Sequence, residues 1–238
     1  MKVSSLPLRY SGWMTRDVVL SLGLIMAGIV ALTVFGMSRV EFTVTAATSR
    51  TIATQLLRQT LLPLVLVATA GLVSSDLSRG YYRSWFSRPV SPPLFYLQRW
   101  IIAGAAVLAY VPAVSLAIAT RSGAIRVSGD HLAKAGLLYL LLGGTVFLLS
   151  TLTRRDWLLA ALLYGTEVVL HFIQRSGAGL GAVGRLVYAI LPPYHVASIE
   201  RPVPAGSDLW AALGWGVGLV LAALTVLRWR PLGTGGRA

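Results

Sequence analysis

Long uncharged apolar runs constrain this chain more than any other feature of its sequence. A helix that crosses the hydrocarbon core of a bilayer needs about 20 mostly apolar residues. The sequence contains six runs of roughly this length, each bounded by charged residues: 18–38, 59–75, 100–120, 135–153, 157–174 and 209–227. Because lipid offers no hydrogen-bond partners to an open backbone, each run is predicted to be a membrane-spanning α-helix.

The composition agrees with a membrane protein. Of the 238 residues, 55% are hydrophobic and 12% are charged, against about 25% charged residues in soluble domains. A soluble chain of this kind would leave large apolar patches exposed. The net charge of +13 is spread between the apolar runs, where cations meet anionic headgroups, so we expect no nucleic-acid partner. The absence of Cys excludes disulfides, thiolate metal sites and cysteine nucleophiles.

The fold predicted from these features is all-α, a polytopic membrane protein with six transmembrane helices in a single domain over residues 1–238. Residues 6–15 mix apolar and aromatic side chains with Arg, which favours an N-terminal helix lying in the membrane interface. Residues 175–208 are rich in Gly and Pro and hold one apolar stretch, 186–191, that is too short to cross. We expect an external excursion there, with short interfacial or re-entrant helices before the last span.

The distribution of basic residues favours cytoplasmic termini. With both termini inside, the cytoplasmic segments hold 12 of the 21 Lys and Arg residues in the shorter share of the loop sequence. Positive residues concentrate on the cytoplasmic side of membrane proteins. Two glycine patches, Gly143-Gly144 and the set Gly214, Gly216 and Gly218, are typical of close helix–helix packing.

The segment between the second and third runs reads SSDLSRGYYRSWFSRPVSPPLFYLQRW, from Ser74 to Trp100. It is too polar to cross a membrane, and aromatic and Arg side chains alternate in it. These residue types concentrate binding energy at protein interfaces, so a short helix over 78–86 is predicted to be a docking surface. The alternative is an aromatic belt at the membrane interface whose arginines bind headgroups.

The order of residues in this segment resembles the permease subunits of type-2 ATP-binding-cassette (ABC) transporters. In that family the second span ends in an acidic residue, followed by a glycine, a helix and a Ser-Arg-Pro-Val-Ser-like stretch; Asp76, Gly80 and Ser87–Ser91 stand at those positions. The family usually has Glu in place of Asp76 and a basic residue in place of Pro92. The resemblance implies a cytoplasmic coupling helix within 76–91, with these residues contacting a separate ATPase: Asp76, Arg79, Gly80, Tyr81, Tyr82, Arg83, Trp85, Phe86, Arg88 and Pro89.

The same resemblance implies partners and a location. The chain would be a permease subunit of an exporter in a bacterial or archaeal plasma membrane, served by an ABC-type ATPase subunit, in two copies, that carries the ATP and Mg. The chain itself has no GxxxxGK(S/T) phosphate loop, so we expect it to bind no cofactor and to be no enzyme by itself. Six helices enclose little space, so the translocation path is predicted to need a second permease chain, identical or related, within the membrane lipids.

Glu167 and His171 lie inside the fifth run, one helical turn apart. An acidic side chain near the bilayer centre costs on the order of 3 kcal/mol to insert. The pair is therefore a candidate polar substrate path, proton relay or cation site, or else an interhelical hydrogen bond that fixes dimer register. We expect no metal site, because no third donor is near in sequence. His131 and His195 are expected to be solvated loop histidines.

Two other functions remain open from the sequence. A non-catalytic scaffold or channel would use the aromatic segment to bind some other protein. An intramembrane enzyme would need an activated nucleophile or an open metal site, and the sequence has neither an HExxH motif nor a GxSG motif with a suitably placed His. The substrate of a transporter is not selected by any residue pattern.

Overall fold

A computed structural model of the protein describes residues 27–28, 31, 46–79, 91–122, 129–177, 179–199 and 202–229. In these ranges every regular element is helical, and five helical segments are long and apolar enough to cross a membrane. They are, in chain order, α2 (Ala46–Thr69) continued by α3 (Ser74–Arg79), α5 (Pro92–Ser122), α6 (Gly129–Leu138) with η1 (Tyr139–Gly143) and α7 (Gly144–Leu152), α8 (Asp156–Arg175) and α10 (Ser207–Trp229).

These five segments confirm a helical, multi-pass membrane protein. The run at 18–38 lies outside the described residues, except for Ala27, Gly28 and Ala31, which are helical. The predicted interfacial helix at 6–15 also lies outside them. The same is true of most of the predicted coupling residues, namely Gly80, Tyr81, Tyr82, Arg83, Trp85, Phe86, Arg88 and Pro89.

Three helices begin well before the apolar runs that predicted them. The predicted apolar runs begin just after Arg58, Arg99 and Lys134, yet each of these residues lies inside its helix. A charged residue does not end a helix when its side chain reaches the surface or a partner. Helix α5 starts instead at Pro92, because proline fits the first turn, where its missing N–H has no intrahelical acceptor.

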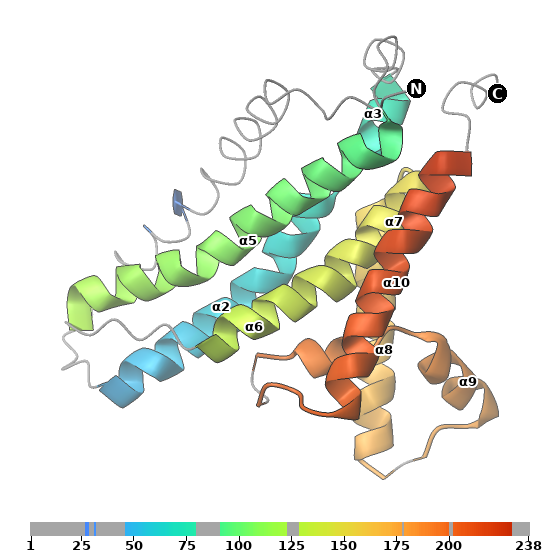
Figure 1. Ribbon diagram of the computed structural model, residues 1–238. Helices are drawn as coiled ribbons and strands as arrows, with labels where there is room; N and C mark the ends of the chain where they lie inside the picture. The colour runs from blue at the N-terminus through green and yellow to red at the C-terminus, as the bar shows by residue number, and fades with distance from the viewer. Residues whose placement is uncertain are drawn as a thin grey trace.

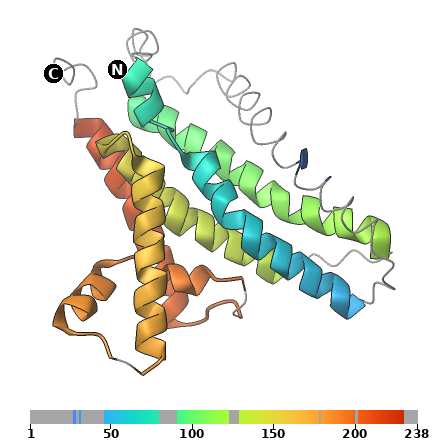
Figure 2. The same cartoon turned by 180° about the vertical axis from the view of Figure 1, so that it is seen from behind.

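The segment α6–η1–α7 is the centre of the fold. In its apolar window 72% of the residues are buried, against 17% in α8 and in α10. Helices α2, α5 and α6 lie side by side at a slant, and α7 packs against α10 and α8 (Figure 1). The view from behind shows α8 running along the back of this group (Figure 2). The central segment therefore contacts all the other described spans.

A π-helical turn, η1, interrupts the central segment at Tyr139–Gly143. Its first residue packs its ring on Trp100, with centroids 4.9 Å apart, and its hydroxyl donates to the Trp100 carbonyl. The ring fills the space beside Gly104, where an added Cβ would collide with it. Tyr139, at the start of this turn, thus packs the central segment closely against α5.

Glycines set the close approach of α7 and α10. An added Cβ at Gly144 would lie 3.4 Å from the Gly216 carbonyl oxygen, and one at Gly216 would overlap the Leu140 side chain. This confirms the packing role predicted for Gly144 and Gly216. Gly214 and Gly218 face open space instead, so only part of the predicted patch is used inside the described fold.

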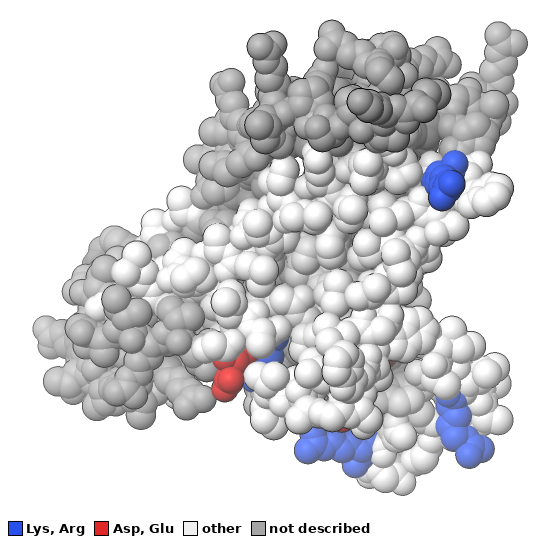
Figure 3. All heavy atoms as spheres, in the orientation of Figure 1, with Lys and Arg blue, Asp and Glu red and all other residues white. Residues whose placement is uncertain are grey.

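The outer surface is apolar along the length of the spans. Figure 3 shows a broad uncharged band on one face, with basic side chains near its upper and lower ends and acidic side chains near its lower end. Large exposed hydrophobic side chains lie on α8 and α10, among them Phe172 at 71% exposed and Trp210 at 72%. A band of this kind suits hydrocarbon as its solvent.

The segment between α8 and α10 contains two short helices, α9 (Ala182–Ile190) and η2 (Tyr194–Ala197). Helix α9 is strongly amphipathic, and Gly184 and Tyr188 are its half-buried positions, one turn apart on the same face. Pro192 and Pro193 follow it and end the helix. The chain then returns through η2 towards α8 before α10 begins.

Candidate functional site

Glu167 is the most deeply buried carboxylate in the middle of a described span. It lies on α8, its side chain is 1% exposed, and its Oε1 is hydrogen-bonded to Nδ1 of His195. Its Oε2 is sealed from solvent and has no hydrogen-bond partner. An ionised or neutral carboxyl in such a place needs partners on both oxygens.

His171 lies one turn further along α8, as the sequence predicted. Its Nδ1 is 2.9 Å from the hydroxyl oxygen of Tyr188 on α9. Its ring stacks on that of His195, with centroids 4.0 Å apart and planes at 13°. One ligand atom from each of Glu167, His171 and His195 lies within 4.8 Å of the others. We call these three residues the Glu–His–His cluster.

Both expectations for the loop histidines were wrong. His195 is only 21% exposed at its side chain and completes the cluster. His131 is buried inside α6, with its Nε2 3.1 Å from Thr54 Oγ1 on α2. No local pattern in the sequence places His195 beside α8, since it arrives from another element after a turn through α9. The third donor that seemed to be missing is therefore present.

The segment around η2 is held firmly against the helices. The hydroxyls of Tyr194 and Thr145 on α7 are 2.7 Å apart and share a hydrogen bond. Burial raises the pKa of Tyr194 to about 12, and the charge of Glu167 adds to the rise, so the hydroxyl stays protonated at neutral pH. The buried ammonium of Lys134 donates to the Ile199 carbonyl at 2.8 Å.

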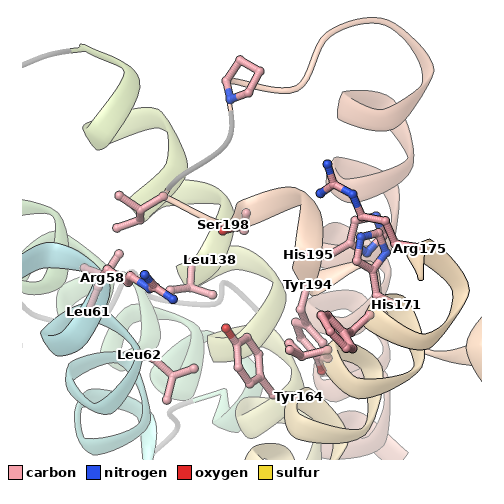
Figure 4. A pocket seen from close by; sticks show the side chains of 15 residues that line it. Arg58, Leu61, Leu62, Leu138, Tyr164, His171, Arg175, Tyr194, His195 and Ser198 are labelled. Carbon is pink, nitrogen blue, oxygen red and sulfur yellow. The ribbon is translucent and has the colours of Figure 1, made fainter. Parts of the chain in front are cut away.

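A cavity of about 730 Å³ adjoins the cluster. Its walls come from α2, the end of α6, α8, residues 194–199 and Pro202, and its polar lining residues are Arg58, Tyr164, His171, Arg175, Tyr194, His195 and Ser198. Figure 4 shows Arg58 on the wall opposite the two histidines, with Tyr164 between them. The volume lies within the range of small-molecule sites.

A second polar arrangement lies where α2 gives way to α3. The helix breaks at Gly71, whose φ of 69° is accessible to glycine at no steric cost. Asp156 Oδ2, at the start of α8, accepts hydrogen bonds from the Gly71 N–H at 2.9 Å and from Ser74 Oγ at 3.2 Å. No local pattern in the sequence predicts these contacts, because Asp156 lies 85 positions from Gly71 and 82 from Ser74.

Asp76 follows one turn later and is bound to α5. Its Oδ2 is 2.7 Å from Arg99 Nη1, and the same nitrogen donates to the Leu72 carbonyl at 3.1 Å. Arg79 ends α3 three residues beyond. The start of the predicted coupling segment is therefore tied to α5 through Arg99, and the break just before it is tied to α8 through Asp156.

No protein-family model matches this chain, and neither a curated protein nor a solved structure does. Over the residues that it describes, the structure by itself defines the class of protein as an all-helical, multi-pass membrane protein. A polar cluster and a cavity lie among the spans, and a braced break lies where the second run ends.

Proposed function

We propose that this chain is the permease subunit of an ABC exporter, which forms a translocation path as a dimer. A separate ATPase subunit, docking on the cytoplasmic segment 76–91, drives transport. The observation that carries the proposal is the order Asp76, Gly80 and Ser87–Ser91 after an apolar run, which resembles the coupling segment of type-2 permeases.

The bracing at the break supports a mechanical role for this segment. A force applied to the chain just after Arg79 reaches α2 through the backbone and α5 through Arg99. It reaches α8 through Asp156. Ion pairs and capped turns of this kind transmit small displacements because packed helices have few alternative arrangements. A plain solvated loop would need no such connections to three spans.

The interior of the described spans also suits a transporter. Ionisable residues within membrane spans are functional candidates by default, because they are costly to insert and mark substrate or ion pathways. The Glu–His–His cluster and the adjoining cavity provide such groups on α8 and beside it. The open apolar faces of α8 and α10 offer room for lipid and for a second permease chain.

The first experiment extracts a tagged chain gently from its own membranes and asks what copurifies. The proposal predicts a soluble subunit with nucleotide-stimulated ATPase activity in a one-to-one ratio with this chain. If no such subunit accompanies an intact, monodisperse chain, the proposal fails, and a scaffold or channel becomes the better explanation.

A matched set of aromatic variants locates the docking surface. The double change Tyr82→Ala and Trp85→Ala should remove the copurifying ATPase while leaving membrane insertion intact, because large aromatic side chains anchor interfaces. Trp210→Ala is the control, since Trp210 is 72% exposed in the first turn of α10, and this end of α10 lies at the opposite end of the spans from α3 (Figure 1). Retention of the ATPase by the double variant would exclude docking at 76–91.

A further inference from the structure

The Glu–His–His cluster contains more ligating capacity than hydrogen bonding uses. Glu167 Oε2 is buried without a hydrogen-bond partner, and only 1% of the side chain is exposed. A buried polar atom without a partner is destabilising, and more so when the group is charged. The same carboxylate lies within 4.8 Å of a nitrogen from each of two histidines.

We propose that Glu167, His171 and His195 form a binding site for a divalent transition-metal ion of the Zn²⁺ class. The inference stands on this cluster alone and does not require the ATPase partnership. Two imidazoles and one carboxylate are the ligand set of open zinc sites and of related first-row metals. Mg²⁺ and Ca²⁺ prefer oxygen donors throughout, so the two nitrogens select against them.

The hydrogen bonds around the cluster assign the ligand atoms. Nδ1 of His171 shares its hydrogen bond with the Tyr188 hydroxyl, and when Nδ1 carries the proton, the lone pair for the metal is on Nε2. Histidines that bind metals commonly donate their other N–H to such an outer partner. Tyr188 is therefore the outer partner that orients His171.

Metal binding displaces a proton at the other histidine. Nδ1 of His195 and the Glu167 carboxylate are hydrogen-bonded to each other. A divalent cation that takes the place of the proton between them is bound by both groups, and the proton leaves to solvent. The neighbouring Oε2 gains a partner in the same step.

Closing the site needs a small movement. Ligand atoms around a tetrahedral Zn²⁺ are about 3.3 Å apart, given bonds of about 2.0–2.1 Å, whereas the three donor atoms here lie within 4.8 Å. Imidazoles bind in the plane of the ring, so the parallel stack of His171 and His195 must open as one ring rotates. The expected result is a tighter attachment of η2 to α8.

The adjoining cavity supplies the remaining coordination position. Three protein ligands leave a tetrahedral ion with one open site, which a water or another small ligand fills. His171 and His195 both line the cavity, so this position faces its interior. Arg58 and Arg175, at the exposed rim, carry positive charge and favour an anionic fourth ligand.

The test is a titration of the full-length chain, purified without a histidine tag, stripped with a chelator and held in lipid nanodiscs. We expect one Zn²⁺ per chain, release of a proton on binding, no competition by Mg²⁺, and a tetrahedral absorption spectrum with Co²⁺. Hydrogen exchange of residues 194–199 should slow when the metal is bound. Absence of stoichiometric Zn²⁺ binding to this chain overturns the proposal.

Variants separate the site from adventitious histidine binding. Glu167→Gln and His195→Gln should each weaken Zn²⁺ binding by about 100-fold or more, and Tyr188→Phe by about 10-fold, the lower end of the effect of losing an outer partner. His131→Gln is the matched control, because His131 is a buried histidine outside the cluster. The affinity of this variant for Zn²⁺ should equal that of the parent chain.

Equal affinity in the parent chain, Glu167→Gln and His195→Gln would overturn the proposal and leave the cluster as a hydrogen-bonded brace. If those variants do not fold, the Co²⁺ spectrum and the exchange measurement on the parent chain decide the question. The outcome is independent of whether an ATPase subunit copurifies.

Discussion

The imidazole rings of His171 and His195 lie parallel, with centroids 4.0 Å apart and planes at 13°. One ring comes from α8 and the other from η2, and α9 lies between them along the chain. The stack, together with the bond from His195 to Glu167, fastens the segment after α9 to the middle of a span. Tyr194 and Lys134 hold the same segment against α7 and α6.

Replacing Lys134 with Met should loosen this segment without disturbing the spans. The change removes a charged donor from the Ile199 carbonyl, and hydrogen bonds to charged groups contribute about 2 kcal/mol. Amide exchange of residues 194–199 should accelerate by about 30-fold, which is the same energy expressed as a rate. Arg185→Met, at an exposed position on α9, is the control. Unchanged exchange in Lys134→Met would show that the lysine is not an anchor.

Breaking the pair of Asp76 and Arg99 should destabilise the protein measurably. The pair is largely shielded, with side-chain exposures of 11% and 29%, and contacting groups in one network couple by about 1–2 kcal/mol. A double-mutant cycle with Asp76→Asn and Arg99→Gln, read by thermal unfolding in detergent, measures this coupling. Arg228→Gln, exposed in the last turn of α10, should change little. A coupling free energy of zero would show that the pair of Arg99 and Asp76 does not stabilise the attachment of α3 to α5.

Asp156→Asn should weaken the break between α2 and α3. Oδ2 accepts from the Gly71 N–H and Ser74 Oγ, and Oδ1 accepts from the Trp157 N–H at 2.8 Å, whereas an amide cannot accept at both of its terminal atoms. The expected loss is about 2 kcal/mol of unfolding free energy, since a buried donor then lacks a partner. Asp208→Asn, in the exposed first turn of α10, should stay within about 0.5 kcal/mol. Equal effects of the two changes would contradict the capping role of Asp156.

The same substitution should destabilise the protein at one glycine on α10 and leave it unaffected at another. Gly216→Ala introduces a Cβ that overlaps Leu140 and lies 3.3 Å from its carbonyl carbon, and overpacking of this kind costs about 1–3 kcal/mol. Gly218→Ala meets nothing within 4 Å and should cause no loss. Thermal unfolding of the two variants in the same detergent gives the comparison, and a stable Gly216→Ala variant would mean that η1 and α10 are not closely packed.

Several features were predicted from the sequence because they are local. Five apolar runs form spans, since length and hydropathy suffice when lipid forbids other backbone conformations. Glu167 and His171 share a face of α8 because a helix brings residues four apart into line. The packing glycines Gly144 and Gly216 could be identified, but their partner surfaces could not.

The sequence predicts the helix ends less well, because charged residues bound the apolar runs but do not end the helices. Arg99 and Lys134 lie within helices since each finds an acceptor on another element, Asp76 for one and Ile199 for the other. Such acceptors are distant in sequence. The apolar runs therefore show which segments cross a membrane but understate how far each helix extends.

The sequence alone determined that this chain belongs in a membrane, because a chain of this kind in water would expose large apolar patches. It also determined that Glu167 and His171 meet, through the fixed geometry of one helix. Only the tertiary structure decided that His195 joins them and that Asp156 caps the break at Gly71. Both contacts depend on how the chain returns after a turn, which is set by packing between elements and not by any local pattern of residues.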